Sequence, residues 1–409
     1  MADNVIKTNQ TQTWQVNDSN ETWLVTKDAT FNVINQYAIL ESGSGNTITV
    51  LGDINVSGNV SGIRFQGSTS DVVIGAKSVI NAINAESGIH YEGAGGHISV
   101  SGTIKGGDNA IHGNVWAVVE NRGKLSGDDG IVFDDAGSDI TNFRSIDVTG
   151  TAIETGAESS LVVNEINGVI HSGDKGVVFT GMGESVLSNK GLIQADDVAI
   201  ESGDDRLTAT NTGNIIGDVM LGGGSDRFDT RRGALDGTIH GGEGDDEFLI
   251  SKSSVKIVEM AGGGEDAVYS TAGYTLSNGV ERLLLRGGKD IDGNGSALAN
   301  DLFGNSGDNA LSGRNGNDNL DGGLGGDILS GDLGKDVFIF NSGYGKDRVT
   351  DFKDGVDHIR SDMVQTQQQF DNLDIKQAGD NVVIDFGAGE KLILEHFTMA
   401  KLDFNDFVI

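Results

Sequence analysis

Residues 295 to 339 repeat one nine-residue phrase five times without a gap. Its form is G-G-x-G-x-D-x-U-x, in which U is a large apolar residue. The copies begin at Gly295, Gly304, Gly313, Gly322 and Gly331. Position six holds Asn300, Asn309, Asp318, Asp327 and Asp336, and position eight holds Leu302, Leu311, Leu320, Leu329 and Phe338. An oxygen-bearing side chain therefore recurs every nine residues, next to glycines and one apolar residue.

Three further copies precede this run, and their carboxylates are more widely spaced. They are LGGGSDRFD from Leu221, GGEGDDEFL from Gly241 and AGGGEDAVY from Ala261. Their position-six residues, Asp226, Asp246 and Asp266, are evenly spaced. Because this even spacing is a plausible coil length in a repeat protein, we expect these three carboxylates to stack in one file and to share ions between neighbouring turns.

The residue types in this phrase are those of a calcium site. Glycines can take tight turns with positive φ, whose carbonyl oxygens point inward, and Asp adds an anionic oxygen. Calcium accepts six to eight oxygen ligands in loose geometry, whereas magnesium demands a tighter octahedron. Several ions are expected. The predicted ligands are the eight position-six residues with Gly222, Gly224, Gly241, Gly244, Gly262, Gly264, Gly304, Gly307, Gly313, Gly316, Gly322, Gly325, Gly331 and Gly334.

The copies are not equivalent, and two consecutive nonapeptides make one coil. Copies n and n+2 should therefore stack, with Gly313 over Gly331 and Gly304 over Gly322. Asn300 and Asn309 replace the usual Asp, and Leu221 and Ala261 replace the first glycine. Sites formed by those turns should bind calcium more weakly.

These repeats resemble those of the repeat-in-toxin (RTX) family, whose glycine- and Asp-rich nonapeptides form calcium-loaded parallel β-rolls. The segment DVFIFNSGYGKDRVTDFKDGVDHI, from Asp336 to Ile359, is similar to the segment that closes such rolls. The ending with Asp406, Phe407, Val408 and Ile409 is similar to that of many type I secretion substrates. The resemblance implies a type I transporter as a partner and a secreted, extracellular or cell-surface protein. A final strand docked on the roll is the alternative for this ending, and one segment could do both.

A second, longer repeat precedes the nonapeptides. Six phrases place apolar residues at Ile104, Leu125, Val148, Ile170, Ile193 and Ile216, and looser copies add Val56 and Ile80. A period near 22 with short alternating strands and Gly, Asp or Asn at the corners indicates a right-handed parallel β-helix. A β-sandwich is the alternative, although it gives no reason for one phrase to recur at one spacing.

The predicted fold class is therefore all-β, a parallel β-helix continuing into a calcium-loaded β-roll. Residues 1–50 do not fit the repeat and are expected to form an N-terminal β cap containing Trp14, Trp23 and Phe31. Residues 51–220 should form the β-helix, and residues 221–340 the roll. Residues 341–409 should form a C-terminal cap with the secretion signal.

Composition excludes several classes of protein. With 61 acidic and 28 basic residues the net charge is -33, which would repel the phosphates of a nucleic acid. There is no cysteine, so disulfides and thiolate metal sites are excluded. No apolar run approaches the roughly 20 residues of a membrane span, and the N-terminal residues lack a signal peptide's apolar core. Calcium bound outside the cell would cancel the repulsion within the array.

The function predicted from these features is that of a secreted calcium-binding β-solenoid of structural or interaction type. The alternatives are an extracellular polysaccharide lyase, hydrolase or epimerase on the β-helix, and an adhesin that binds glycan. His90, Tyr91, His97 and His112 form the best local cluster for catalysis. No HExxH, GxSxG, lyase or epimerase motif accompanies them, so histidines at turns are the favoured interpretation and no catalytic residue is predicted.

Overall fold

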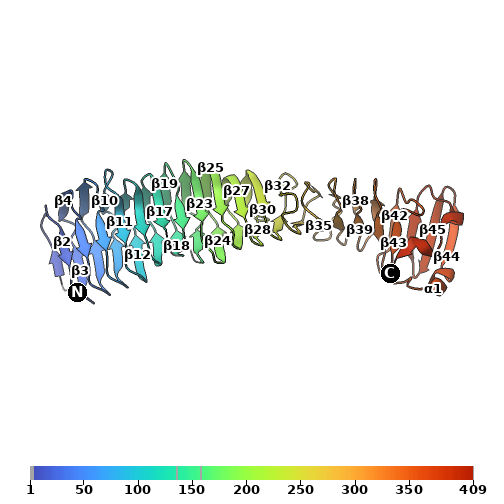
Figure 1. Ribbon diagram of the computed structural model, residues 1–409, viewed down its shortest axis with the longest axis horizontal. Coiled ribbons are helices and arrows are strands. Elements are labelled where there is room, and N and C mark those ends of the chain that lie inside the picture. The colour runs from blue at the N-terminus through green and yellow to red at the C-terminus, as the bar shows by residue number, and fades with distance from the viewer. Residues whose placement is uncertain (1–3, 135–136, 157–158, 409) are drawn as a thin grey trace. The chain divides into compact units, whose positions relative to one another are not determined.

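The computed structural model describes residues 4–134, 137–156 and 159–408, which form a succession of short strands (Figure 1). The chain divides into two compact units, residues 1–240 and 241–409. Each unit is a stack of coils made from short strands that pair in parallel with the equivalent strands of neighbouring coils. This arrangement confirms the predicted all-β solenoid. The four-part division of the chain stays a prediction.

Each coil of residues 1–240 contributes strands to three files. The first file is β1 (Asn4–Ile6), β3 (Thr22–Val25), β6 (Thr47–Val50), β9 (Asp71–Ile74), β12 (Gly96–Val100), β15 (Ala117–Asn121), β18 (Asp139–Asn142), β21 (Leu161–Asn164), β24 (Ser185–Asn189), β26 (Leu207–Asn211) and β28 (Arg227–Asp229). The second is β4 (Thr30–Ile34), β7 (Asp53–Ser57), β10 (Val79–Asn81), β13 (Thr103–Lys105), β16 (Lys124–Ser126), β19 (Ser145–Val148), β22 (Val169–Ser172), the first parts of β25 (Leu192–Ser202) and β27 (Asn214–Gly222), and β29 (Ala234–Asp236). The third is β2 (Trp14–Val16), β5 (Ile39–Glu41), β8 (Ile63–Phe65), β11 (Ser87–Tyr91), β14 (Asn109–Gly113), β17 (Asp129–Phe133), β20 (Ile153–Thr155), β23 (Lys175–Phe179) and the second parts of β25 and β27.

Residues 241–409 have two files of strands. The first is β31 (Glu247–Ile250), β33 (Ala267–Ser270), β35 (Arg282–Leu285), β37 (Asp301–Phe303), β39 (Asn319–Asp321), β41 (Val337–Ile339), β43 (His358–Arg360) and β47 (Phe407–Val408). The second is β34 (Tyr274–Thr275), β36 (Gly293–Asn294), β38 (Ala310–Ser312), β40 (Ile328–Ser330), β42 (Lys346–Val349) and β46 (Glu390–Leu394), followed by the antiparallel β45 (Asn381–Gly387) and β44 (Asp374–Ala378). The remaining elements are β30 (Thr238–Gly242), β32 (Lys256–Val258), α1 (Gln367–Asp371), η1 (Met399–Lys401) and η2 (Phe404–Asp406).

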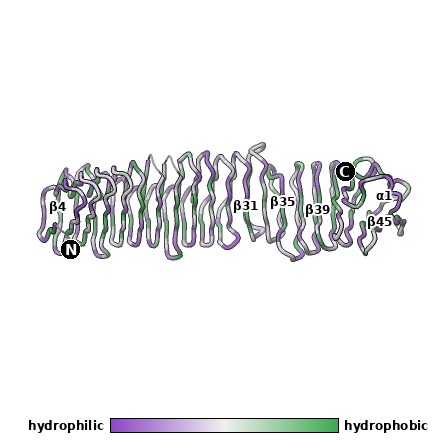
Figure 2. Tube along the Cα trace, turned by 90° about the horizontal axis from the view of Figure 1, so that it is seen from below, coloured by the Kyte–Doolittle hydropathy of each residue, from purple (hydrophilic) through white to green (hydrophobic). Residues whose placement is uncertain are grey.

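The interior of residues 1–240 is a file of stacked apolar side chains, and it corrects three of the predicted positions. Ile54, Ile146 and Ile215 occupy the file instead of Val56, Val148 and Ile216. A shift of one residue turns a strand side chain to the opposite face, so Ile216 is 38% exposed. The members, all at most 1% exposed, are Phe31, Ile54, Ile80, Ile104, Leu125, Ile146, Ile170, Ile193 and Ile215. Figure 2 shows the resulting alternation of apolar and hydrophilic residues along the coils.

Residues 1–50 were expected to lie outside the repeat, and this expectation was wrong. Strands β3 and β4 pair in parallel with β6 and β7, so the described part of residues 1–50 forms the first coils. The rings of Trp14 and Trp23 contact edge to face, with centroids 4.7 Å apart, and Phe31 lies beside them. Their role as a cap stays a prediction.

A ladder of buried asparagines, which the sequence analysis missed, runs along one corner of this unit. Each member ends a strand of the first file, and each Nδ2 donates to Oδ1 of the next member at 2.8 to 2.9 Å. The last amide donates to Thr230 Oγ1 at 3.0 Å. An amide has both a donor and an acceptor, so the ladder can continue from coil to coil without any added group. The members are Asn121, Asn142, Asn164, Asn189 and Asn211, all at most 1% exposed.

The substitution Asn164→Ala should destabilise this unit, because it leaves Asn189 Oδ1 without its donor and removes the acceptor of Asn142 Nδ2. Each buried group left unpaired costs about 1–3 kcal/mol of unfolding free energy. Urea unfolding followed by circular dichroism measures the loss. The matched control is Asn55→Ala, since Asn55 donates to Asn32 on the exposed face. Equal losses in the two variants would contradict a structural role for the buried ladder.

Candidate metal centre

The position-six carboxylates of residues 241–409 also form ladders, but these have a different composition. In one, Asp318 Oδ1 accepts from Asn300 N at 2.7 Å and Asp336 Oδ1 accepts from Asp318 N at 3.0 Å. In the other, Asp327 Oδ1 accepts from Asn309 N at 2.7 Å. The expected stacking of copies n and n+2 is confirmed, since equivalent residues of alternate copies face one another in β37 and β39 and in β38 and β40.

Each of these carboxylates uses one oxygen in the ladder and leaves the other bare. Asp318, Asp327 and Asp336 are at most 1% exposed, and their Oδ2 atoms have no hydrogen-bond partner among the described residues. A carboxylate has no proton to donate, so it cannot satisfy a neighbouring carboxylate as an amide does. A bare anionic oxygen in a buried position is costly unless a cation or a proton neutralises it.

The first glycine of each phrase makes room for that bare oxygen. A Cβ atom on Gly322 would lie 2.3 Å from Asp327 Oδ2, and one on Gly331 would lie 2.3 Å from Asp336 Oδ2. Both distances are far shorter than a van der Waals contact. Glycine at this position therefore keeps a space open in front of the carboxylate.

Burial raises the pKa of these carboxyl groups towards neutrality. Desolvation is the largest cause in each case, and it raises the pKa of Asp318 and Asp327 to about 7 and that of Asp336 to about 6. The hydrogen bond that each accepts from the backbone acts in the opposite direction but is weaker.

Two carboxylates outside the predicted set extend the ladders: Asp347 accepts from Asp327 N at 3.0 Å, and Asp357 accepts from Asp336 N at 3.1 Å.

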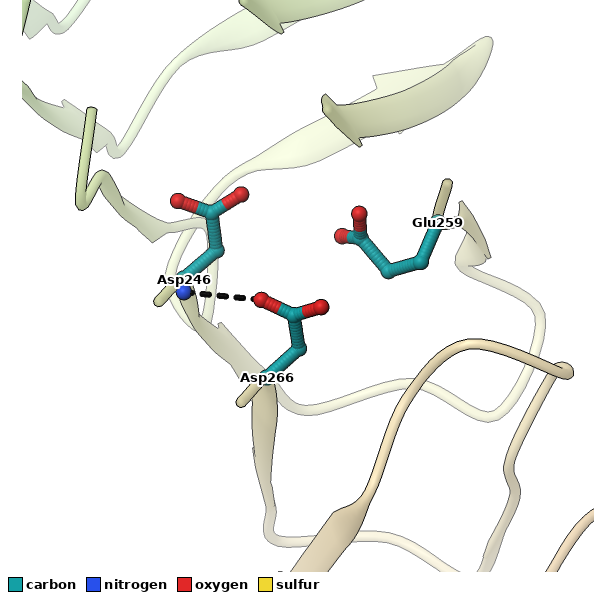
Figure 3. Close-up of side chains that lie close together, drawn as sticks. All are labelled: Asp246, Glu259 and Asp266. Carbon is teal, nitrogen blue, oxygen red and sulfur yellow. Dashed lines mark hydrogen bonds between the residues drawn. The ribbon is translucent and has the colours of Figure 1, made fainter. Parts of the chain in front are cut away.

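A third group of carboxylates converges at the start of this unit (Figure 3). Carboxylate oxygens of Asp246, Glu259 and Asp266 lie within 4.8 Å of one another, and all three side chains are buried. Asp266 Oδ1 accepts from Asp246 N at 2.9 Å, and Glu259 Oε2 accepts from Gly242 N at 3.1 Å. Asp266 Oδ2 and Glu259 Oε1 have no hydrogen-bond partner among the described residues. Acidic residues thus cluster here as a possible metal site.

Burial and neighbouring carboxylates raise the pKa of two members of this cluster. Desolvation, followed by the charge of Asp266, raises the pKa of Glu259 to about 8. Desolvation also raises the pKa of Asp266 to about 6. A Cβ atom on Gly241 would lie 2.0 Å from Glu259 Oε1, so this glycine again leaves space for a carboxylate oxygen. Three hard oxygen donors around a small space fit a divalent cation such as calcium.

The two asparagines at position six are satisfied without a cation. Asn300 Nδ2 donates to Val280 O at 2.8 Å, and its Oδ1 accepts from Ser296 N at 2.6 Å. Asn309 Nδ2 donates to Ile291 O at 2.7 Å, and its Oδ1 accepts from Asn305 N at 2.8 Å. In these two asparagines both the side-chain nitrogen and the side-chain oxygen have a hydrogen-bond partner, whereas each carboxylate leaves one oxygen without a partner among the described residues.

All the predicted position-six residues are buried. The structure brings Asp246 and Asp266 together, and it separately aligns the position-six residues of the five consecutive copies in the two ladders described above. Asp226 belongs to the other unit, where its Oδ1 accepts from Leu207 N at 2.5 Å. Six predicted glycines take positive φ: Gly222, Gly224, Gly244, Gly262, Gly316 and Gly325. Eight lie outside the positive-φ region and provide close approach instead: Gly241, Gly264, Gly304, Gly307, Gly313, Gly322, Gly331 and Gly334.

The sequence analysis missed Glu259, Glu281, Asp347 and Asp357. Three of them carry a signal that could have been found, an acidic residue two positions before a buried apolar one. Glu281 precedes Leu283 in this way, Asp347 precedes Val349, and Asp357 precedes Ile359. Glu281 continues the file by accepting from Asp266 N at 2.9 Å. Glu259 follows no such pattern and is brought to Asp246 only by the fold.

The histidine cluster is only partly assembled, and its residues lie in strands rather than at turns. His90 and His112 are in register in β11 and β14, with ring centroids 4.7 Å apart. His112 Nε2 lies 2.8 Å from Asp134 Oδ2. Tyr91 is fully buried, which raises the pKa of its hydroxyl, and it donates to Ser70 O at 2.6 Å. His97 is in β12, in a different file of strands.

The C-terminal segment docks as a strand. Phe407 of β47 pairs with Ile359 of β43, and the rings of Phe370 and Phe407 lie 5.5 Å apart. Asp406 is buried and its carboxylate accepts from Asp403 N at 2.8 Å. Ile409 lies outside the described residues. No helix in the described part of the chain is long and apolar enough to cross a membrane.

Comparison with known proteins gives little further information. No family model matches the sequence. No curated protein matches it either. Among solved structures, the chain is similar to the extracellular lipase LipA from Serratia marcescens, with 17% identity and a TM-score of 0.22 over 56% of this chain. The chain spans 40% of the length of that lipase, and a similarity this low carries no functional implication.

Without calcium, residues 241–409 should become less stable as the pH rises. The ladder carboxyls hold a proton in the fold up to about pH 6 to 8, whereas the unfolded chain releases it near the ordinary Asp value of 3.8. The fold therefore binds more protons than the unfolded chain in this window, and its stability falls from pH 5 to pH 8. Urea unfolding of calcium-depleted protein at the two pH values measures this. Greater stability at pH 8 would show that the carboxylates are compensated within the chain.

Proposed function

We propose that the protein is a secreted, calcium-binding β-solenoid of structural or interaction type, in which residues 241–409 complete their fold when calcium binds. One observation carries the proposal. Successive coils bury carboxylates whose second oxygen has no partner among the described residues, and a glycine keeps space open beside several of those oxygens. The resemblance of residues 221–340 to RTX repeats agrees with it.

The chemistry of the donors favours calcium over other cations. The donors are carboxylate oxygens in a chain that has no cysteine, so ions that prefer sulfur are disfavoured. Asp318, Asp327, Asp336 and the cluster of Asp246, Glu259 and Asp266 would hold the ions. When bound, calcium would supply positive charge beside oxygens that otherwise require a proton near neutral pH. Ligands must lose that proton first, so calcium affinity should rise with pH.

Export before folding follows from the same chemistry. Cytosolic calcium is scarce, so the ladders would remain charged and mutually repelling, and the chain would stay loose enough for a type I transporter. Calcium outside the cell would then stabilise the folded form through its binding free energy. We place the roll at residues 221–340 and the export signal in residues 341–409.

The decisive variant replaces Asp318, Asp327 and Asp336 together by Asn. Asn300 and Asn309 show that an amide is accommodated at this position with a partner for both its nitrogen and its oxygen. The triple variant should therefore bind fewer calcium ions and yet be more stable than the natural chain when calcium is absent. Titration calorimetry counts the ions, and thermal unfolding with and without calcium gives the stability.

The matched control replaces the exposed Asp371, Asp374 and Asp380 by Asn, which changes the net charge equally. This control should retain the calcium stoichiometry and the calcium-dependent gain in stability. If the ladder variant binds as many ions as the control, then these three carboxylates are not ligands.

Export can be tested apart from calcium binding. Removing residues 406–409 should trap the chain inside a type I secreting host, whereas Phe370→Ala, which loses the ring contact with Phe407 but keeps the tail, should still be exported. The protein in the medium is measured by immunoblotting. Retention of both variants would mean that docking of the tail matters, and export of both would remove the signal from this segment.

A further inference from the structure

A groove rich in basic residues runs along one corner of residues 1–240, although the chain as a whole is strongly acidic. It lies where each coil turns from the first file of strands into the second, immediately after the asparagine ladder. Two adjoining depressions of about 820 Å³ and 360 Å³ form it, and they share Arg144, Asn167 and Val169. It lies outside residues 241–409, so it does not depend on the proposed calcium sites.

The floor of the groove is a file of residues in register on successive coils. Thr103, Lys124, Ser145, Val169, Leu192 and Asn214 each begin the strand that follows the turn. Because neighbouring parallel strands are about 4.8 Å apart, the groove repeats its chemistry at that interval along the stack. The floor residues carry hydroxyl, amide and aliphatic groups and one cation, Lys124.

The rim carries the cations, and the asparagine ladder fixes their positions. Arg122 and Lys190 each follow a ladder residue directly, and Arg144 follows Asn142 by two positions. Arg122 and Arg144 are on consecutive coils, about 4.8 Å apart along the stack, and Lys190 is two coils further. Ile166 is 75% exposed and adds an apolar surface to the rim.

More than half of the basic residues in residues 1–240 lie at this corner. The turns and the first residue of the following strands hold Lys27, Lys77, Arg122, Lys124, Arg144, Lys190, Arg231 and Arg232. The rest of residues 1–240 holds only Lys7, Arg64, Lys105, Lys175, Arg206 and Arg227. These positive side chains lie on a chain whose net charge is strongly negative. Their corner is therefore a candidate site for a specific anionic ligand.

Two of the four cations that line the groove form ion pairs, and the other two do not form any with the described residues. Arg122 pairs with Glu120 at 3.1 Å, and Lys190 pairs with Glu165 at 2.8 Å. Lys124 and Arg144 are exposed and form no ion pair with any residue that the structure describes. These two side chains should therefore contribute most to the binding of an external anion.

We propose that this groove binds a linear acidic polysaccharide, with its chain along the stack of coils. A uronate chain presents one carboxylate per sugar at a spacing close to that of the coils, and its hydroxyls and C–H faces match the polar and aliphatic floor. Arginine and lysine would hold the carboxylates by charge-assisted hydrogen bonds. A nucleic acid fits less well, because the ring of Phe143 is covered by Arg122 at 3.9 Å and is not open for stacking on a base.

Titration calorimetry of the full chain at one fixed calcium concentration tests the proposal, with oligogalacturonate as the probe. The double variant Lys124→Gln with Arg144→Gln should weaken binding about tenfold or more, since it removes two charge-assisted hydrogen bonds. The control is Lys105→Gln with Arg206→Gln, which removes one lysine and one arginine outside the groove. Its affinity should be unchanged, and both variants should keep the natural calcium response.

Three further ligands separate the possible origins of binding. Methyl-esterified oligogalacturonate should not bind, because it keeps the sugars and loses the charge. A heparin hexasaccharide that displaced oligogalacturonate would place sulfated chains in the same ligand class, still as acidic polysaccharides. The proposal would be overturned by no binding of either acidic chain, by equal losses in the two double variants, or by duplex DNA binding more tightly at equal salt.

Discussion

The structure depends on how the buried corner of each coil satisfies its polar groups. A solenoid must join every coil to the next through backbone and side-chain hydrogen bonds, because no other element covers its interior. From Asn121 to Asn211 the corner residue is an amide, which donates to one neighbour and accepts from another. In residues 241–409 it is a carboxylate, which can only accept. Wherever the ladder holds Asp318, Asp327, Asp336 or Asp347, one carboxylate oxygen is therefore left without a partner among the described residues.

The two units therefore differ in how their corner residues are paired. The corner asparagines of residues 1–240 pair with one another, whereas buried carboxylates of residues 241–409 leave one oxygen without a partner among the described residues. Within residues 1–240, the apolar file and the asparagine ladder join successive coils through groups of the chain itself. In the nonapeptide coils, a single apolar residue from each phrase supplies the core, and glycines keep the space beside the carboxylates open. Such coils bury little apolar surface to offset desolvated charge, so the cations of the proposed sites would add most of the stability there. Cations of the proposed polysaccharide groove directly follow members of the asparagine ladder, so the ladder would also position them for binding.

The solenoid class and the stacking of alternate nonapeptides could be predicted because periodicity is a local property of the sequence. The register of the longer repeat was harder to predict, since Ile215 and Ile216 are adjacent apolar residues and only packing decides which faces inward. The asparagine ladder was overlooked because asparagine at a corner is also typical of an exposed turn. Glu259 could not be predicted at all, because it reaches Asp246 from a segment without a repeat.

Hydrogen exchange measured by mass spectrometry, with and without calcium, tests the central claim most directly. The account predicts that amides of residues 4–240 are protected in both conditions, because the apolar file and the asparagine ladder there need no ions. Amides of residues 241–409 should exchange rapidly in the absence of calcium and become protected when it is added. Equal protection of the two units without calcium would contradict the account, since it would show that the carboxylate ladders are stable on their own.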